Sequence, residues 1–150
     1  MTYKGIYRVK NIQKYRGDFS KVIYRSLWER QTFRWLDENP DVLSWSSEEI
    51  VIPYICKTDG KVHRYFVDLL INFKNGKTYL IEIKPKKQTE PPKQPSRKTP
   101  RYITEVMGYA KNISKWETAH EFCKQKGWIF EVWTEETLKG LGIKILSSDK

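Results

Sequence analysis

The stretch FVDLLINFKNGKTYLIEIK, residues 66–84, decides the fold of this chain. Two runs rich in β-branched and aromatic residues flank a turn around Asn75 and Gly76, a pattern typical of a β-hairpin. A two-residue turn would mix apolar and charged side chains on both faces. A three-residue loop with Gly76 in the left-handed bulge position instead pairs Ile71 with Tyr79 and makes one face uniformly apolar. We therefore predict the three-residue loop.

The opposite face of this predicted hairpin carries charged side chains. Asp68 would lie across from Glu82, and Phe66 would lie across from Lys84. Two opposed carboxylates repel each other unless a cation lies between them. Carboxylate oxygens are suitable ligands for Mg²⁺, and substrate phosphate commonly completes such a site. One interpretation is therefore a magnesium site; the other is an ion pair between Lys84 and either acid at the end of the sheet.

The elements around the hairpin suggest a mixed α/β fold. A helix is predicted from Ser26 to Asn39, where Pro40 follows, and its first turn has the Ser26/Glu29 pattern of a capping box. The remaining expected elements are a strand over 49–56, a helix from 102 that restarts at Ser114 and ends at Gly127, a strand over 128–134 and a helix over 135–140. The order predicts a mixed sheet flanked by helices, with the last strand parallel to its neighbour.

Length and charge indicate one domain and a polyanionic partner. The 150 residues are enough for a single domain, and the net charge of +10 favours nucleic acid. Residues 1–25 form a basic, tyrosine-rich arm, which is either a solvated tail or a segment that follows phosphates. The arm residues expected to contact DNA are Lys10, Lys14 and Arg16. No apolar stretch is long enough to cross a membrane.

Residues 85–101 hold five of the seven prolines and are predicted to form a mobile loop. Its expected DNA contacts are Lys86, Lys87, Lys93, Arg97, Lys98 and Arg101. The two cysteines, Cys56 and Cys123, have no CxxC or CxxH neighbours, so we interpret them as buried thiols rather than zinc ligands.

Several longer strings resemble a known nuclease family. The chain is similar to TnsA-like endonuclease domains of the PD-(D/E)XK superfamily, and more closely to the head completion nucleases of T-even-like bacteriophages. The superfamily's shared core is αβββαβ, which agrees with the predicted element order. The strings that carry the resemblance are KYRGD (14–18), YRSLWER (24–30), SEEIVIPY (47–54), HRYFVD (63–68) and LIEIKP (80–85).

This resemblance implies a role for each charged residue of the hairpin. Asp68 and Glu82 correspond to the metal-binding acids, with the Ile83 carbonyl as a further ligand, and Lys84 corresponds to the lysine that positions or activates the attacking water. Glu29 matches an additional acid of the family, unless its carboxylate turns back to cap its own helix. The implied cofactor is Mg²⁺, with Mn²⁺ able to substitute.

Other positions match the family with less definite roles. His63 and Arg64 are expected to contact phosphate, with packing as the alternative. Glu48 and Glu49 also match the family, in the string SEEIVIPY, but the resemblance assigns them no role. Val67 replaces the proline that usually precedes the first acid, which predicts a less kinked strand.

The resemblance implies a DNA endonuclease of little sequence specificity that acts in phage head completion, in the cytoplasm of the infected bacterium or associated with the virion. Portal or head-completion proteins would then be partners, and the oligomeric state is left open. One alternative is a non-catalytic head-assembly or DNA-end-binding protein that retains the fold. Another is a restriction or repair nuclease, which would need a specificity element that the sequence does not reveal.

Overall fold

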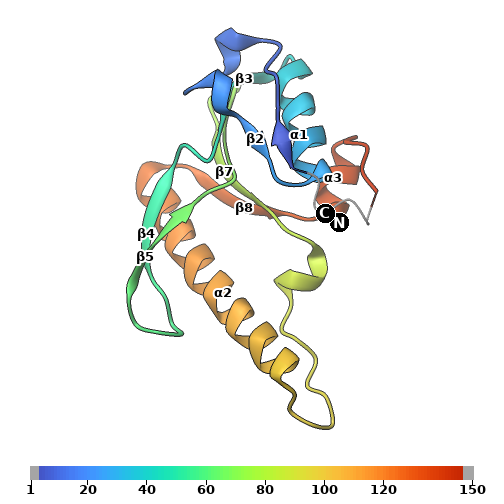
Figure 1. Cartoon of the computed structure of the whole chain (residues 1–150). Helices are drawn as coiled ribbons and strands as arrows, with labels where there is room; N and C mark the ends of the chain where they lie inside the picture. Colours follow the sequence, from blue (N-terminus) through green and yellow to red (C-terminus); the bar gives the residue numbers. More distant parts are fainter. Residues whose placement is uncertain (1–3, 147–150) are drawn as a thin grey trace.

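The computed structural model describes residues 4–146 and is built around a four-stranded mixed sheet (Figure 1). Its strand order is β3-β6-β7-β8, in which β6 is antiparallel to both β3 and β7, and β8 is parallel to β7. The bounds are Val42–Ser47 for β3, Leu69–Phe73 for β6, Thr78–Ile83 for β7 and Ile129–Trp133 for β8. The predicted mixed sheet and its parallel last strand are confirmed.

The β6–β7 hairpin has the predicted register. Ile71 pairs with Tyr79, and Leu69 pairs with Ile81. The loop is closed by the Phe73 amide, which donates to the Lys77 carbonyl at 2.9 Å, and Gly76 has the positive φ of 89° that a bulge glycine needs. The buried apolar face specified this register, as expected.

The hairpin is shorter than predicted, because the chain bends at Asp68 and changes sheets. Phe66 pairs with Val51 rather than with Lys84, as part of a separate antiparallel pair formed by β4 (Val51–Ile55) and β5 (Val62–Phe66). The Val67 amide donates to the Ile50 carbonyl at 3.0 Å instead of entering the β6–β7 ladder. The expectation of a straighter strand at Val67 is therefore wrong: hydrogen bonding to another strand produces the bend without proline.

Strand β3 was not predicted from the sequence, although it occupies one edge of the main sheet. Its segment VLSWSS carries three buried serines, Ser44, Ser46 and Ser47, where a typical strand would show β-branched residues. Trp45 is fully buried and stacks on Phe33 at a centroid distance of 5.4 Å. Pairing with β6 stabilises this strand, and such pairing cannot be predicted from the local sequence.

Two of the three predicted helices are confirmed closely. Helix α1 spans Leu27–Glu38 between the caps Ser26 and Asn39, and helix α3 spans Glu135–Gly140. Helix α2 is one continuous element, Pro100–Lys126, so the predicted restart at Ser114 is wrong. The Ser114 hydroxyl donates to the Ala110 carbonyl of the same helix at 3.0 Å and accepts from the Lys57 amide, just after β4, at 3.1 Å. It therefore does not cap a new helix.

The N-terminal segment is anchored to the body rather than free. It contains the short strands β1 (Gly5–Ile6) and β2 (Ile23–Tyr24), which pair with each other, and 3₁₀ turns at Ile12–Lys14 and Phe19–Lys21. Its buried side chains Tyr7, Val9, Tyr15 and Val22 join the core between α1 and the sheet. A solvated tail therefore does not describe the arm over residues 4–25; its first three residues lie outside the described part of the chain.

Helix α2 packs against the β4–β5 hairpin and β7 at its C-terminal half, while its N-terminal half extends away from the sheet (Figure 1). The segment between β7 and α2 contains a short 3₁₀ helix, Lys86–Thr89, and leads to the tip of this projection (Figure 1). None of the helices within residues 4–146 is long and apolar enough to cross a membrane.

Candidate active site

The two acids of the hairpin lie close together at the end of β7. Glu82 is only 6% exposed, and its Oε2 accepts a hydrogen bond from the Tyr65 hydroxyl at 2.9 Å. Asp68 Oδ2 accepts from the Ile83 amide at 2.8 Å, so its side chain occupies the position that a strand carbonyl would take in a continued ladder. The predicted ladder pair of Asp68 with Glu82 is absent, yet the bend still brings Asp68 next to Glu82.

Burial and the neighbouring charge act together on Glu82. Desolvation by burial, followed by the negative charge of Asp68, raises the pKa of Glu82 to about 8, although Lys84 and the Tyr65 hydroxyl oppose the shift. A buried carboxyl beside a second acid is the arrangement that a bound cation relieves, since opposite charge restores the ionised form. The donor set of carboxylate oxygens and a nearby carbonyl fits Mg²⁺.

Lys84 lies at the same end of the sheet as the two acids, directly after β7. Its Nζ is 3.9 Å from Glu82 Oε1 and its side chain is 23% exposed, while its amide donates to the Trp133 carbonyl at 3.0 Å. The ammonium is therefore held near the acids but still reaches solvent. This geometry contains the ion pair considered from the sequence, and it also leaves the ammonium able to contact a water or phosphate oxygen.

Glu29 is buried and faces the start of its own helix. Its Oε1 accepts from the Arg25 amide and its Oε2 from the Ser26 hydroxyl, each at 3.3 Å, and its own amide donates to Ser26 Oγ at 3.2 Å. This is the capping arrangement that competes with a metal role. The positive charge of Arg25 interacts with both Glu29 and Asp68, so the capping carboxylate borders the acid cluster.

An ion pair between Arg25 and Glu48 was missed by sequence analysis. Arg25 Nε and Nη2 donate to the two Glu48 oxygens at 2.8 and 3.1 Å, a bidentate contact that raises the pKa of Arg25. Within residues 4–146, Glu48 is the one non-glycine residue with a positive φ, 55°, and its amide donates to the Asp68 carbonyl at 3.1 Å. The pair thus ties the start of α1 and the end of β3 to the Asp68 bend. Both residues lie in strings that carry the family resemblance, which was the available signal.

Lys115 of helix α2 also approaches the acids. Its Nζ lies 5.3 Å from the centroid of the Tyr65 ring, a cation–π contact. Burial lowers its pKa, and the charges of Glu82 and, more weakly, Asp68 act in the opposite direction. A second lysine therefore faces the acidic cluster from a helix that is distant in sequence.

Comparison with known proteins identifies the family. Residues 39–135, which include Asp68, Glu82 and Lys84, match the family described as TnsA-like endonuclease N terminal. The chain belongs to the TnsA-like endonuclease family. It is also 43% identical over 148 residues to the head completion nuclease of Enterobacteria phage T4, an alignment that covers 96% of this chain and 99% of that protein. The resemblance and fold class predicted from the sequence are confirmed.

The basic residues predicted to contact DNA are spread over the surface of this TnsA-like domain, and several bind other parts of it. Lys14 Nζ donates to three carbonyls at the end of α1, and Lys10 pairs with Glu38 at 2.8 Å. Further ion pairs join Lys86 to Glu136 and Arg101 to Glu105. A 2.7 Å hydrogen bond joins His63 to Asp59, and Arg64 lies over the Phe66 ring. The remaining members of the predicted set are all exposed: Arg16, Lys87, Lys93, Arg97 and Lys98. DNA contact stays a prediction for all of them.

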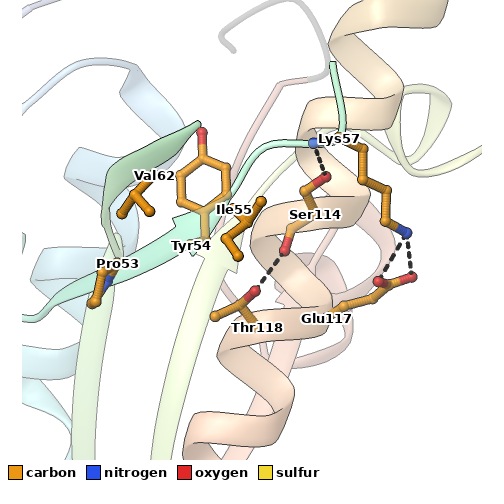
Figure 2. A pocket seen from close by; sticks show the side chains of 8 residues that line it. All are labelled: Pro53, Tyr54, Ile55, Lys57, Val62, Ser114, Glu117 and Thr118. Carbon is orange, nitrogen blue, oxygen red and sulfur yellow. Dashed lines mark hydrogen bonds and ion pairs between the residues drawn. The ribbon is translucent and has the colours of Figure 1, made fainter. Parts of the chain in front are cut away.

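One groove of the TnsA-like domain lies away from the acids. It has a volume of about 370 Å³ and lies between the β4–β5 hairpin and α2, lined by Pro53, Tyr54, Ile55, Lys57, Val62, Ser114, Glu117 and Thr118 (Figure 2). Lys57 crosses one end, where its Nζ pairs with Glu117 at 3.0 Å (Figure 2). Neither Asp68 nor Glu82 lines this groove.

Proposed function

We propose that this protein is a single-domain, Mg²⁺-dependent DNA endonuclease that hydrolyses phosphodiester bonds with little sequence specificity. The observation that carries the proposal is the buried Glu82 beside Asp68, with Lys84 Nζ 3.9 Å from Glu82 Oε1 at the same edge. Family membership supports a nuclease, and the acid pair supports a divalent cation as its cofactor.

Asp68, Glu82 and the Ile83 carbonyl would hold the ion, with Mn²⁺ able to replace Mg²⁺. When bound, the ion polarises a phosphoryl oxygen and lowers the pKa of a coordinated water. Lys84 orients the attacking water and neutralises charge that develops on the phosphate. Tyr65 holds the Glu82 carboxylate in place through its 2.9 Å hydrogen bond. Glu29 caps the start of α1 through Ser26. It would act on the site through Arg25, whose charge interacts with both Glu29 and Asp68.

The basic N-terminal segment and the segment over residues 85–101 would hold DNA through its phosphates. Contacts of this kind carry no sequence information, which supports the low specificity, and they make binding strongly dependent on salt. The name of the T4 relative, head completion nuclease, supports a role in completing phage heads. In that role the protein would process DNA at the packaged head, in the infected bacterium or in association with the virion, together with portal or head-completion proteins.

A second function is favoured by a different observation. The projecting half of α2 exposes a short apolar stripe in which Ile103 and Met107 are each 50% exposed. Positions i and i+4 lie on one helix face, and contact with another protein would cover them. In this alternative the chain is a non-catalytic assembly protein that retains the nuclease fold.

Cleavage of supercoiled plasmid at low salt, with Mg²⁺ or with EDTA, tests the nuclease against this alternative. We expect nicking or linearisation that needs Mg²⁺ and falls by about 100-fold or more in Lys84→Ala. Lys77→Ala is the matched control, because Lys77 is an exposed lysine at the opposite end of the same hairpin. Wild-type protein that binds DNA without cutting it, or equal cleavage by Lys84→Ala, would favour the assembly protein.

A further inference from the structure

Three side chains with metal-ligating atoms meet at the turn of the β4–β5 hairpin, outside the acidic site. Cys56 Sγ, a carboxylate oxygen of Asp59 and a ring nitrogen of His63 all lie within 4.8 Å of one another. The closest pair is Asp59 Oδ2 and His63 Nε2, 2.7 Å apart. Together they offer one sulfur, one oxygen and one nitrogen ligand from eight consecutive positions of the chain.

The hairpin itself brings these atoms together. His63 pairs across the hairpin with Tyr54, so the two side chains share a face, and Cys56 continues the same face two residues beyond Tyr54. The turn is closed by the Cys56 amide, which donates to the Lys61 carbonyl at 2.9 Å, and by the Gly60 amide, which donates to the Cys56 carbonyl at 2.7 Å. This tight turn, with Gly60 at a φ of 69°, folds Asp59 back toward His63.

We propose that Cys56, Asp59 and His63 bind one Zn²⁺ ion at the turn of this hairpin, with water as the fourth ligand. Zinc takes Cys sulfur, His nitrogen and Asp oxygen in tetrahedral geometry, at about 2.0 to 2.3 Å, so small inward rotations of these side chains complete the site. The Asp59 and His63 side chains are 39% and 40% exposed, which leaves access for the ion and its water. Mg²⁺ does not compete, because it prefers oxygen ligands.

The surroundings of Cys56 suit a ligand thiolate. Its Sγ lies 2.9 Å from Thr58 Oγ1, and hydrogen bonds from Thr58 lower the pKa of the thiol. Burial instead raises the pKa of Cys123 to about 11. Both cysteines are buried, which confirms that part of the sequence prediction. The C-x₂-D-x₃-H spacing becomes a ligand set only once the hairpin is folded.

Zinc at this position would stiffen the strand that supports the acidic site. Tyr65 is two residues beyond His63 on the same face of β5, and its hydroxyl bonds to Glu82. The proposal does not depend on the nuclease function, because its readout is metal binding.

Cobalt substitution tests the site in the full-length protein without an affinity tag. Co²⁺ serves as a spectroscopic probe, since a cysteine thiolate bound to it gives a charge-transfer band in the near ultraviolet. We expect this band to saturate at one ion per chain, to disappear when Zn²⁺ displaces Co²⁺, and to be unaffected by excess Mg²⁺.

The chain provides matched controls, because it contains two cysteines and two histidines. Cys56→Ser should abolish the band, and His63→Gln should weaken Zn²⁺ binding by about 100-fold or more. Cys123→Ser and His120→Gln, which change the other cysteine and histidine, should leave both signals intact. His63→Gln changes a half-exposed side chain, so it tests the site even if Cys56→Ser fails to fold.

Two results would overturn the proposal. One is a folded wild-type protein, checked by circular dichroism, that gives no thiolate band and retains no Zn²⁺ after dialysis. The other is a band that is lost in Cys123→Ser and kept in His63→Gln. In either case Asp59 and His63 form only a hydrogen bond that stabilises the turn.

Discussion

Replacing Glu82 with glutamine is expected to stabilise the metal-free protein, and to do so increasingly as the pH rises from about 4.5 to about 8. Glu82 carries a pKa of about 8 because it is buried beside Asp68, whereas in the unfolded chain it ionises near its ordinary value of 4.5. Between these two values the unfolded state releases a proton that the folded state keeps. Rising pH therefore favours unfolding over this window, and the loss of stability is complete above about pH 8.

The size of the effect follows from the pKa difference. One pKa unit corresponds to about 1.4 kcal/mol, so the full difference corresponds to about 5 kcal/mol. Relaxation of the site and water entry lower the free energy that is observed, and we expect about 2 to 4 kcal/mol. For a chain of this length, a free energy of this size should raise the Tm of Glu82→Gln above that of the wild type by roughly 5 to 15 °C at pH 9. At pH 6 the folded state keeps its proton, but the unfolded chain has already lost it, so the Tm advantage of Glu82→Gln should be present at roughly half of its size at pH 9.

Thermal unfolding in EDTA, followed by circular dichroism from pH 5 to pH 9, measures how the Tm difference between Glu82→Gln and wild type depends on pH. Glu121→Gln is the control, because Glu121 is an exposed acid on α2. Added Mg²⁺ should raise the Tm of the wild type more than that of Glu82→Gln, since the ion binds the ionised carboxylate. A Tm difference between Glu82→Gln and wild type that is the same at pH 6 and pH 9 would refute the assignment of Glu82 as a buried acid of raised pKa.

Three further substitutions test other contacts. Tyr65→Phe removes the hydrogen bond to Glu82, and the Mg²⁺ concentration for half-maximal plasmid cleavage should rise by about tenfold; an unchanged value would show that Tyr65 does not hold the ligand. Lys14→Met removes the ammonium that bonds three carbonyls at the end of α1, and should lower the free energy of unfolding in urea by about 1 to 3 kcal/mol. Gly108→Ala, in open space on α2, should raise that free energy by about 0.5 to 1 kcal/mol, and a decrease would mean that this helix face is covered.

The features that the sequence alone determined are local ones. Alternation of apolar residues and the glycine of the turn were sufficient for the β6–β7 register, because a slip of one residue would expose the apolar face. Ser26 and Pro40 delimited α1, since capping and the restriction before proline act within a few residues. The candidate acids could also be named from the sequence, since charged side chains are unusual on a hairpin face that is expected to be buried.

What only the tertiary structure decided depends on neighbours that are distant along the chain. Strand β3 exists because β6 offers it a partner, and its serine-rich sequence carries no local strand signal. The bend at Asp68 arises because Val67 bonds to Ile50, on the way to another sheet. Arg25 reaches the acids from the segment before α1 and Lys115 reaches them from α2, and their approach follows from packing rather than from any motif spacing. Hydrogen bonds and burial between remote segments therefore set the electrostatics of the site, which periodicity and local propensity do not encode.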